Sequence, residues 1–263
     1  MDEQSQPSCL NVVADLLRRC HSDETVFPPT DLYNEGWLLR ITLDWFSKQK
    51  PSGHELSFSQ GCTWFSEALL PSQFLARFRG DALSESWTHA DGIMGHIRIG
   101  RGGKADTSLD TEVTHFVVTE AKIFSKLSAG VKNASYFNQV ARYAACIAEL
   151  LRKAERKPTD LKRLGLYILA PAETIGYGWF ERPLDKADIK QKVERRVQAY
   201  EGEKDRWFED WFQPVLDQLD VRCLSWESIL DYIGSVDKEY TIGLQDFYQK
   251  CLSFNRPANY QST

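Results

Sequence analysis

The chain has 263 residues, of which 42% are hydrophobic and 26% charged, a composition typical of a globular protein with one large domain or one domain and an accessory lobe. Residues 1–7 lack the basic start and apolar core of a secretory signal, and no apolar stretch approaches the length of a membrane span. We therefore expect a cytoplasmic protein that does not associate with a membrane. Six scattered cysteines form no Cys-x-x-Cys pair and give no support to a zinc ribbon or an iron–sulfur cluster.

The net charge of −5 conceals an uneven distribution along the chain. Residues 122–163 contain ten Lys and Arg against three acidic residues, a net charge of +7 that leaves −12 for the rest of the chain. Such a segment would suit salt-sensitive contacts with a phosphate backbone, with Lys126 and Arg142 as candidate contacts. The alternative is a solvated helix face, which we favour for residues 152–157.

The first 60 residues are predicted to be helical and to pack on the rest of the chain. Apolar residues recur at helical spacing from Leu10 to Cys20. A second helix, capped by Thr30 or Asp31, is predicted to end near Gln49.

A third helical region is predicted from Trp64 to Phe78, bent or restarted at Pro71. Trp64, Phe65, Ala68 and Leu69 would form an apolar face of this helix, and Glu67 lies among them in sequence. A lone Glu on such a helix usually faces solvent, but Glu67 is retained here as a candidate ligand.

Two strands are predicted next, from His89 to Ile99 and from about Val113, joined by a glycine-rich loop at residues 100–106. Strands joined in this way most simply pair antiparallel. In a hairpin centred between Ala105 and Asp106, the numbers of opposite residues sum to 211, which places Asp91 across from Glu120. Opposed carboxylates are destabilising unless a cation lies between them.

The stretch from His115 to Phe124 is the centre of the functional argument. Four residues that suit a buried strand lead into Glu120-Ala121-Lys122, and the period of two puts Glu120 and Lys122 on one face. A carboxylate beside an ammonium suits a metal ion and a polarised nucleophile. Acid-x-Lys also occurs at residues 155–157, 160–162 and 188–190, so the tripeptide alone proves nothing, but only the copy at Glu120 follows a strand-like run.

A long helix is predicted from about Ser135 to Lys153, followed by a strand from Leu164 to Ala170 that would pair in parallel with the central strand. The rest of the chain, residues 173–263, is predicted to be mainly helical and part of the same globular unit. It includes a charged helix from Ala187 to Tyr200 and a possible strand from Val221 to Trp226. Aromatic residues at 207–212 are interpreted as core rather than as contacts with nucleic-acid bases.

The order of these motifs resembles the PD-(D/E)xK nuclease superfamily, which has the restriction-endonuclease-like fold. A helix with Glu67, a strand with Asp91, a strand with Glu120-x-Lys122, a helix and a strand follow one another over residues 61–172. The helix also carries Gln139-x-x-x-Tyr143, which is similar to a signature of the RecB-type branch. The predicted fold is therefore α/β, with a mixed central sheet flanked by helices, an α-β-β-α-β core, and helical N- and C-terminal additions.

The resemblance implies a function for each matched position. Asp91, Glu120 and the backbone carbonyl of Ala121 would bind Mg²⁺, with Mn²⁺ as a substitute, and Glu67 would be an outer or second-metal ligand. Lys122 would activate the attacking water and offset charge on the phosphate. The positions expected to brace the site or contact DNA are Gln139, Tyr143, Lys126 and Arg142.

The sequence departs from the superfamily pattern in two places. His89-Ala90, and not a proline, precedes Asp91, and the cysteine cluster of the iron–sulfur members is missing. The leading hypothesis is a metal-dependent deoxyribonuclease, in genome defence or DNA processing, as a homodimer or with a partner protein. The alternatives are a non-catalytic subunit of the same fold that binds nucleic acid or protein, and an interaction protein in which Glu120 and Lys122 form a surface ion pair of little energetic value.

Overall fold

The structure is a computed structural model that describes residues 9–100 and 105–257. Its strands are β1 (Thr63–Leu70), β2 (Thr88–Gly95), β3 (Ile97–Ile99), β4 (Thr107–Leu109), β5 (His115–Ala121), β6 (Arg163–Ala170) and β7 (Asp220–Ser225). The longer helices are α1 (Cys9–His21), α2 (Glu35–Gln49), α3 (Gln139–Lys153), α6 (Lys186–Gln198), α9 (Trp226–Val236) and α10 (Lys238–Asn255). The shorter helical segments are η1 (Pro29–Asp31), η2 (Pro158–Asp160), α4 (Ala172–Gly176), α5 (Glu181–Leu184), α7 (Asp205–Trp207), η3 (Phe208–Phe212) and α8 (Gln213–Gln218).

A mixed five-stranded sheet in the order β1-β2-β5-β6-β7 organises the fold. The β1–β2 and β2–β5 pairs are antiparallel, whereas β5–β6 and β6–β7 are parallel. β3 and β4 form a separate two-stranded ribbon between β2 and β5 in sequence. The α/β class with a mixed sheet and flanking helices is therefore as predicted, and residues 220–225 from the C-terminal region supply its fifth strand.

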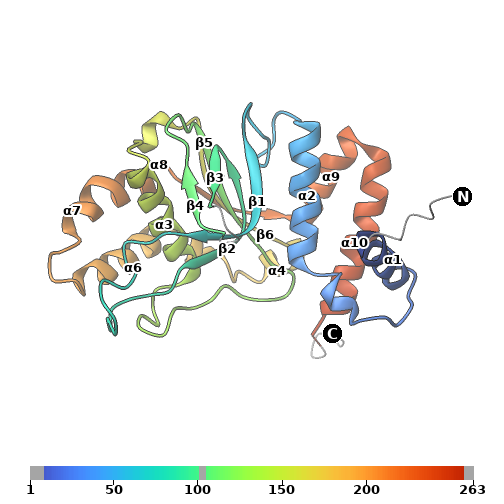
Figure 1. The fold of residues 1–263 in the computed structure, drawn as a ribbon, viewed down its shortest axis with the longest axis horizontal. Helices are drawn as coiled ribbons and strands as arrows, with labels where there is room; N and C mark the ends of the chain where they lie inside the picture. The colour runs from blue at the N-terminus through green and yellow to red at the C-terminus, as the bar shows by residue number, and fades with distance from the viewer. Residues whose placement is uncertain (1–8, 101–104, 258–263) are drawn as a thin grey trace, which may run out of the picture.

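Figure 1 shows the sheet between two helical layers, with α3, α6, α7 and α8 on one side and α1, α2, α9 and α10 on the other. Alternate side chains of β5 point to the two helical layers, as the period of two requires. Phe116 and Val118 pack toward α3, whereas Val117 and Ala121 pack toward α2 and α9. A strand buried on both faces holds its side chains in fixed positions, which is what a precise chemical site needs.

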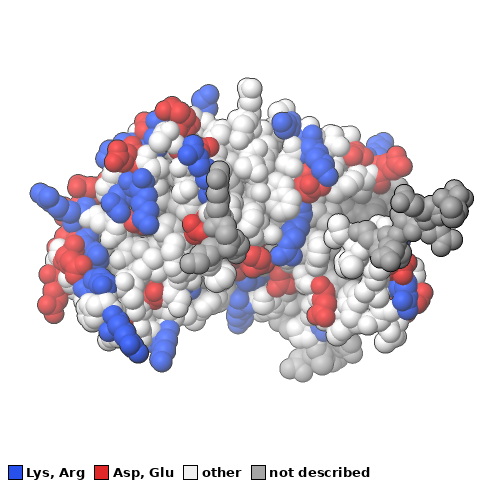
Figure 2. Space-filling view, in the orientation of Figure 1, with Lys and Arg blue, Asp and Glu red and all other residues white. Residues whose placement is uncertain are grey.

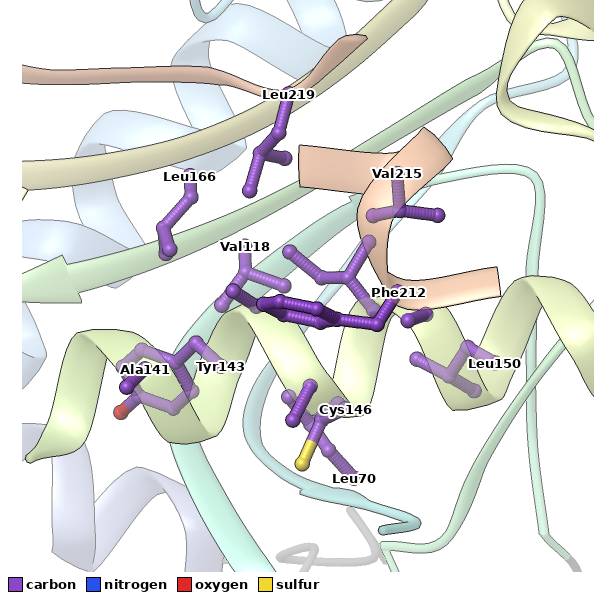
Figure 3. Close-up of a cluster of buried hydrophobic side chains, with 14 of the residues drawn as sticks. Leu70, Val118, Ala141, Tyr143, Cys146, Leu150, Leu166, Phe212, Val215 and Leu219 are labelled. Carbon is purple, nitrogen blue, oxygen red and sulfur yellow. The ribbon is translucent and has the colours of Figure 1, made fainter. Parts of the chain in front are cut away.

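The core on the α3 side is a continuous apolar cluster. Figure 3 shows side chains of β5, β6 and η3 meeting those of α3. The predicted stripe on α3 is confirmed, because Val140, Ala144, Ile147 and Leu151 are all buried. The aromatic segment is also core as interpreted, since Trp207, Phe208 and Phe212 are all less than 10% exposed.

The predicted register of β2 and β5 is confirmed. Gly92 pairs with Thr119, and the following pairs continue to Gly95 with Phe116, so the numbers of partners sum to 211. The predicted parallel pairing of the strand from Leu164 to Ala170 is confirmed as well, with Glu120 beside Ile168. Most of the predicted glycine-rich loop, residues 100–106, lies outside the described residues.

The helix predicted from Trp64 to Phe78 is wrong, because this region forms β1 and a long connection without regular structure. Apolar residues over only eight positions fit either period, and Thr63, Trp64 and Phe65 are good strand formers. Pairing with β2 along the strand decides the outcome. Glu67 interrupts the strand with a left-handed φ of +56°.

Smaller boundaries differ from those predicted. Asn34 caps α2 in place of Thr30 or Asp31, because its side chain accepts the Trp37 N–H at 3.0 Å. α3 begins at Gln139 and not at Ser135, after the Asn138 cap. The strand predicted over residues 89–99 is divided at His96 into β2 and β3.

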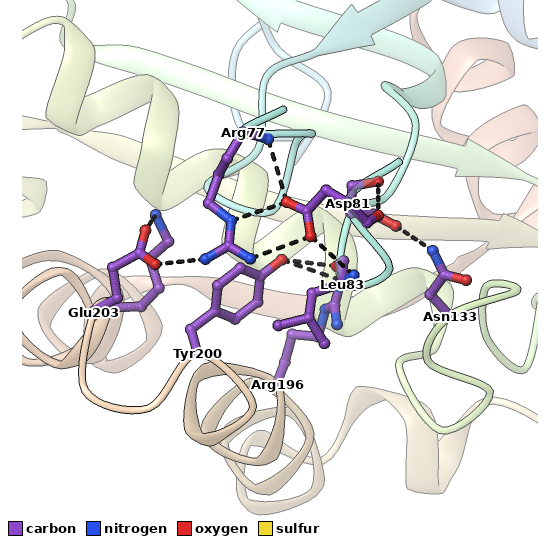
Figure 4. Close-up of polar contacts among 9 residues, drawn as sticks. Arg77, Asp81, Leu83, Asn133, Arg196, Tyr200 and Glu203 are labelled. Carbon is purple, nitrogen blue, oxygen red and sulfur yellow. Dashed lines mark hydrogen bonds and ion pairs between the residues drawn. The ribbon is translucent and has the colours of Figure 1, made fainter. Parts of the chain in front are cut away.

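The connection from β1 to β2, residues 71–87, is held to the α3 side by polar contacts (Figure 4). Arg77 pairs with Asp81 at 2.9 Å and with Glu203 at 2.5 Å. The carbonyl of Leu83 accepts hydrogen bonds from the Tyr200 hydroxyl and from the buried guanidinium of Arg196. These contacts fix the approach to β2, and thereby the residues at its beginning.

Gly95 is a position where only glycine fits. Its φ is +144°, and a Cβ at this position would lie 2.1 Å from the carbonyl oxygen of His115 on β5. We expect Gly95→Ala to lower the free energy of unfolding by about 2–3 kcal/mol, measured by urea denaturation. The control is Gly243→Ala in α10, where a Cβ meets nothing within 4 Å and a gain of about 0.5–1 kcal/mol is expected. Equal midpoints for both variants would contradict this account of the β2–β5 contact.

Candidate active site

Glu120 is the most enclosed acidic residue of the predicted site. It lies near the carboxyl end of β5, between β2 and β6, and is 1% exposed. Its side chain extends toward α3, on the same face of β5 as Val118. A buried carboxylate is costly unless its oxygens accept hydrogen bonds.

Three side chains supply the hydrogen bonds that Glu120 needs. Lys122 Nζ donates to Oε1 at 2.5 Å, Gln139 Nε2 donates to the same oxygen at 2.7 Å, and the Tyr143 hydroxyl donates to Oε2. Burial and the nearby Asp91 nevertheless raise the pKa of Glu120 to about 7. The protein therefore holds this carboxylate in one orientation while making its ionised form unfavourable in the absence of a further cation.

Asp91 lies where β2 and β5 stop pairing. The last pair is Gly92 with Thr119, and beyond it the Ala121 N–H donates to Asp91 Oδ2 at 2.9 Å. If the pairing of β2 with β5 continued, the Ala121 N–H would bond to a backbone carbonyl of β2. The Asp91 carboxylate accepts this hydrogen bond instead. Burial raises the pKa of Asp91, against the lowering effects of the Ala121 N–H and Lys122.

Lys122 is fixed through its backbone to two neighbouring elements. Its N–H donates to the Leu169 carbonyl at 2.8 Å, and its own carbonyl accepts from Trp226 Nε1 at 3.0 Å. Burial alone would lower the pKa of Lys122, but the carboxylates of Glu120, Asp91 and Glu35 raise it above its ordinary value. The ammonium is therefore charged at neutral pH, and its side chain is only 12% exposed.

Gln139 and Tyr143 connect the first turns of α3 to Glu120. Ser128 N–H donates to Gln139 Oε1 at 3.1 Å, which orients the amide so that Nε2 points to Glu120 and to the Tyr143 hydroxyl oxygen. The spacing of four residues places both side chains on one face of the helix. The sequence motif is thus a hydrogen-bonding brace for Glu120.

Two predicted site residues, Glu67 and Arg142, have other partners. Glu67 lies between Ser66 and Ala68, the β1 residues that pair with Gly92 and Ala90, but its side chain is 56% exposed and pairs with Arg40 at 3.1 Å. Arg142 is directed away from solvent, with its side chain only 15% exposed, and lies against Glu85 and Thr88. It therefore does not present its guanidinium to a phosphate backbone, whereas Gln139 and Tyr143 of the same helix point to Glu120.

Lys126 is exposed beyond the site, with its Nζ 4.7 Å from the centre of the Trp179 ring. Of the basic residues in this segment, Lys126 is the next after Lys122 in sequence. The residues of the segment at positions 152–163 follow the far end of α3, roughly 21 Å from Gln139 at 1.5 Å per residue. The length of α3 therefore separates the two halves of the basic segment, and only its first half lies on the Lys122 side of that helix.

The sequence interpretation missed Glu35, in the first turn of α2. This carboxylate is close enough to Lys122 to contribute to its raised pKa. The available signal was Asn34, a residue type favoured at helix N-caps, which would have placed an acidic residue at the start of the helix. With the cap predicted at Thr30 or Asp31, Glu35 was not recognised as a residue of the first turn.

The oxygen donors of Asp91 and Glu120 suit a hard divalent cation. Among the residues that the structure describes, no group of three or more His, Cys, Asp or Glu side chains is arranged to hold a metal. Zinc would require such a set of protein ligands, whereas Mg²⁺ binds through one or two carboxylates and keeps several waters. Asp91 and Glu120 lie where the pairing of β2 with β5 ends, and both have raised pKa values. A bound cation would lower these pKa values, so the two carboxylates fit Mg²⁺.

The brace can be tested through Tyr143. Tyr143→Phe removes the donor to Glu120 Oε2, so we expect divalent-ion affinity to fall by about tenfold to a hundredfold, measured by calorimetric Mn²⁺ titration. Tyr167→Phe is the matched control. Its hydroxyl also donates to a carboxylate, that of Asp220 at the beginning of β7, at 3.0 Å. Equal Mn²⁺ affinity in both variants would show that the Tyr143 hydroxyl serves only packing.

Within residues 9–100 and 105–257, no helix has the length and apolar character needed to cross a bilayer. Comparisons of this chain with protein-family models, with curated proteins and with solved structures found no match.

Proposed function

We propose that this protein is a Mg²⁺-dependent deoxyribonuclease built on a restriction-endonuclease-like core, with DNA as its binding partner. The observation that carries the proposal is the convergence of Asp91, Glu120 and Lys122 where the pairing of β2 with β5 ends. The brace from Gln139 and Tyr143 supports it further, because positioning residues of this kind hold a reactive group in a defined geometry.

The alternative of a surface ion pair does not fit the burial of the two partners. The side chains of Lys122 and Glu120 are 12% and 2% exposed, and the pair shares its surroundings with Asp91. Burying two carboxylates and an ammonium costs free energy that hydrophobic residues at the same positions would avoid. Such an arrangement supports a chemical role.

Asp91, Glu120 and the backbone carbonyl of Ala121 would hold the ion, and bound Mg²⁺ would supply a Lewis acid and an acidic water. Glu120 is kept in its orientation by its three donors. Lys122 would donate a hydrogen bond to the attacking water or to a phosphoryl oxygen and would offset the negative charge that develops there. Its fixed backbone would keep the ammonium in place during the reaction.

The test is a cleavage assay with linear duplex, circular duplex and single-stranded DNA in Mg²⁺, Mn²⁺ or EDTA. We expect cleavage with either metal, none in EDTA, and none by Glu120→Gln purified in parallel. Lys190→Ala is the control, because Asp188-Ile189-Lys190 is the same pattern on the helix α6, with Lys190 exposed. DNA binding without cleavage would identify a non-catalytic subunit, and neither binding nor cleavage would reject the nuclease proposal.

A further inference from the structure

An exposed tryptophan lies beside the site on α2. Trp37 is 37% exposed, and the guanidinium carbon of Arg40 lies 5.3 Å from the centre of its ring. Arg40 also donates to Ser66 Oγ at 3.0 Å, and Ser66 pairs with Gly92, the residue after Asp91. Ser66 and Gly92 face α2 and not α3, so this contact places Trp37 and Arg40 on the α2 side of the sheet. Glu35, two residues before Trp37, acts on Lys122, and Arg40 also donates to Glu67, so this tryptophan lies next to the α2 side of the site.

A second exposed tryptophan lies at the approach to β2. Trp87 is 39% exposed and precedes Asp91 by four residues. The backbone around it is fixed, because the carbonyl oxygen of His89 lies 2.8 Å from the Tyr143 hydroxyl oxygen and the preceding connection is held by the contacts in Figure 4. A large apolar ring exposed on a fixed backbone is available to contact a ligand at no further cost in backbone ordering.

A third aromatic group follows the end of β5. Lys126 Nζ lies 4.7 Å from the Trp179 ring, whose centre is 5.0 Å from that of Tyr177, a residue 40% exposed. Thr174 Oγ1 donates to the carbonyl of Ile123 at 2.9 Å, which ties this segment to the chain just after Lys122. Trp179 is itself half-buried against the core, so Tyr177 is the exposed ring of this group, and we call Trp37, Trp87 and Tyr177 the aromatic rim.

The charges near the site do not suit a long duplex backbone. The rim is accompanied by Arg40 and Lys126, whereas Glu35, Glu67 and Asp91 are acidic and the basic residues after α3 are remote. On the face shown in Figure 2, acidic and basic side chains are interspersed and no continuous basic stripe crosses it. Binding of a duplex depends on many phosphate contacts, but binding of single strands draws on base stacking over aromatic rings.

We infer that the site takes an unpaired DNA strand whose bases stack on the aromatic rim while one phosphate reaches Lys122. Glu120 is 1% exposed and the side chain of Lys122 is 12% exposed, so the ammonium is reached through a small part of the surface. A flexible single strand can bring one phosphate to such a group more readily than a rigid duplex. This inference rests on the proposed nuclease function and adds its substrate class.

The experiment measures fluorescence anisotropy of a labelled oligonucleotide of mixed sequence, as a single strand and as the matched duplex, in EDTA so that binding is read without cleavage. We expect the single strand to bind more tightly, and Trp37→Ala and Trp87→Ala each to weaken its binding by about tenfold. Trp211→Ala is the control, since Lys157 Nζ lies 4.3 Å from that ring in the part of the chain after α3. Trp37→Phe and Trp87→Phe keep a stacking surface and should retain most of the affinity.

Duplex binding equal to or tighter than single-strand binding would overturn the inference, as would losses in Trp37→Ala and Trp87→Ala no larger than in Trp211→Ala. Metal-dependent cleavage of duplex DNA would then leave the nuclease function standing with a different substrate. Tryptophan-dependent binding of the single strand, with no cleavage in Mg²⁺ or Mn²⁺, would support the binding surface and reject the hydrolytic function. Absence of both binding and cleavage would reject both.

Discussion

Lys122→Ala is expected to reduce kcat for DNA cleavage by about a hundredfold to a thousandfold, with little change in KM. The reason is that the ammonium acts on charge that develops in the transition state, whereas the two carboxylates that would bind the ion remain. Divalent-ion affinity should be preserved or increased, because a competing positive charge beside Glu120 has been removed. Single-turnover cleavage and Mn²⁺ calorimetry on the same preparation measure the two quantities separately.

The stability of Lys122→Ala needs a parallel measurement. Removing one member of a buried ion pair leaves Glu120 near Asp91 without its compensating charge, which destabilises the protein without metal at pH 8. Saturating Mg²⁺ should restore the midpoint of urea denaturation, so the kinetic comparison is made with metal present. Undiminished cleavage by Lys122→Ala, with Lys190→Ala as the reference, would remove Lys122 from the reaction.

Glu120→Gln is expected to abolish detectable cleavage, a loss of at least about a thousandfold, through a different cause. It removes the negative charge that would bind the ion, so Mn²⁺ affinity should fall and a high Mn²⁺ concentration should partly restore activity. Unchanged Mn²⁺ affinity in Glu120→Gln would exclude Glu120 as a ligand. The pair of variants thus separates metal binding from charge stabilisation.

Glu120 also makes a prediction about stability and pH in EDTA. The pKa of Glu120 in the folded protein is about 7, above its ordinary value of 4.5, so the folded state holds a proton that the unfolded state has lost between these values. Stability from this group is present below pH 4.5 and declines as pH rises to 7, by about 3 kcal/mol over the window. Glu120→Gln should lack this decline.

The comparison between wild type and variant is necessary because His115 acts in the opposite direction. Burial lowers the pKa of His115 to about 4, so its contribution to stability is lost as pH falls from 6.5 toward 4. The two groups offset each other in the wild type, and only the difference between the two proteins isolates Glu120. A difference in unfolding free energy that does not change between pH 4.5 and 7.5 would contradict the raised pKa.

The sequence by itself determined the centre of the sheet. Strand formers from His115 onward, antiparallel pairing with the preceding strand and the parity of strand faces were sufficient to give the register sum of 211, although the β3–β4 ribbon and not a simple loop joins the two strands. The parallel strand after α3 and the buried stripe of that helix were also predictable. These features depend on local periodicity and short connections, which the order of residues alone specifies.

Only the tertiary structure decided the surroundings of that centre. Glu67 is on a strand and pairs with Arg40, Arg142 contacts Glu85, and Glu35 approaches Lys122 from a helix that is distant in sequence. The short apolar run at residues 63–70 fits both helical and strand periods, and its pairing with β2 selects the strand. The direction of each charged side chain depends on which distant element packs against it, and the length of α3 separates basic residues that are close in sequence.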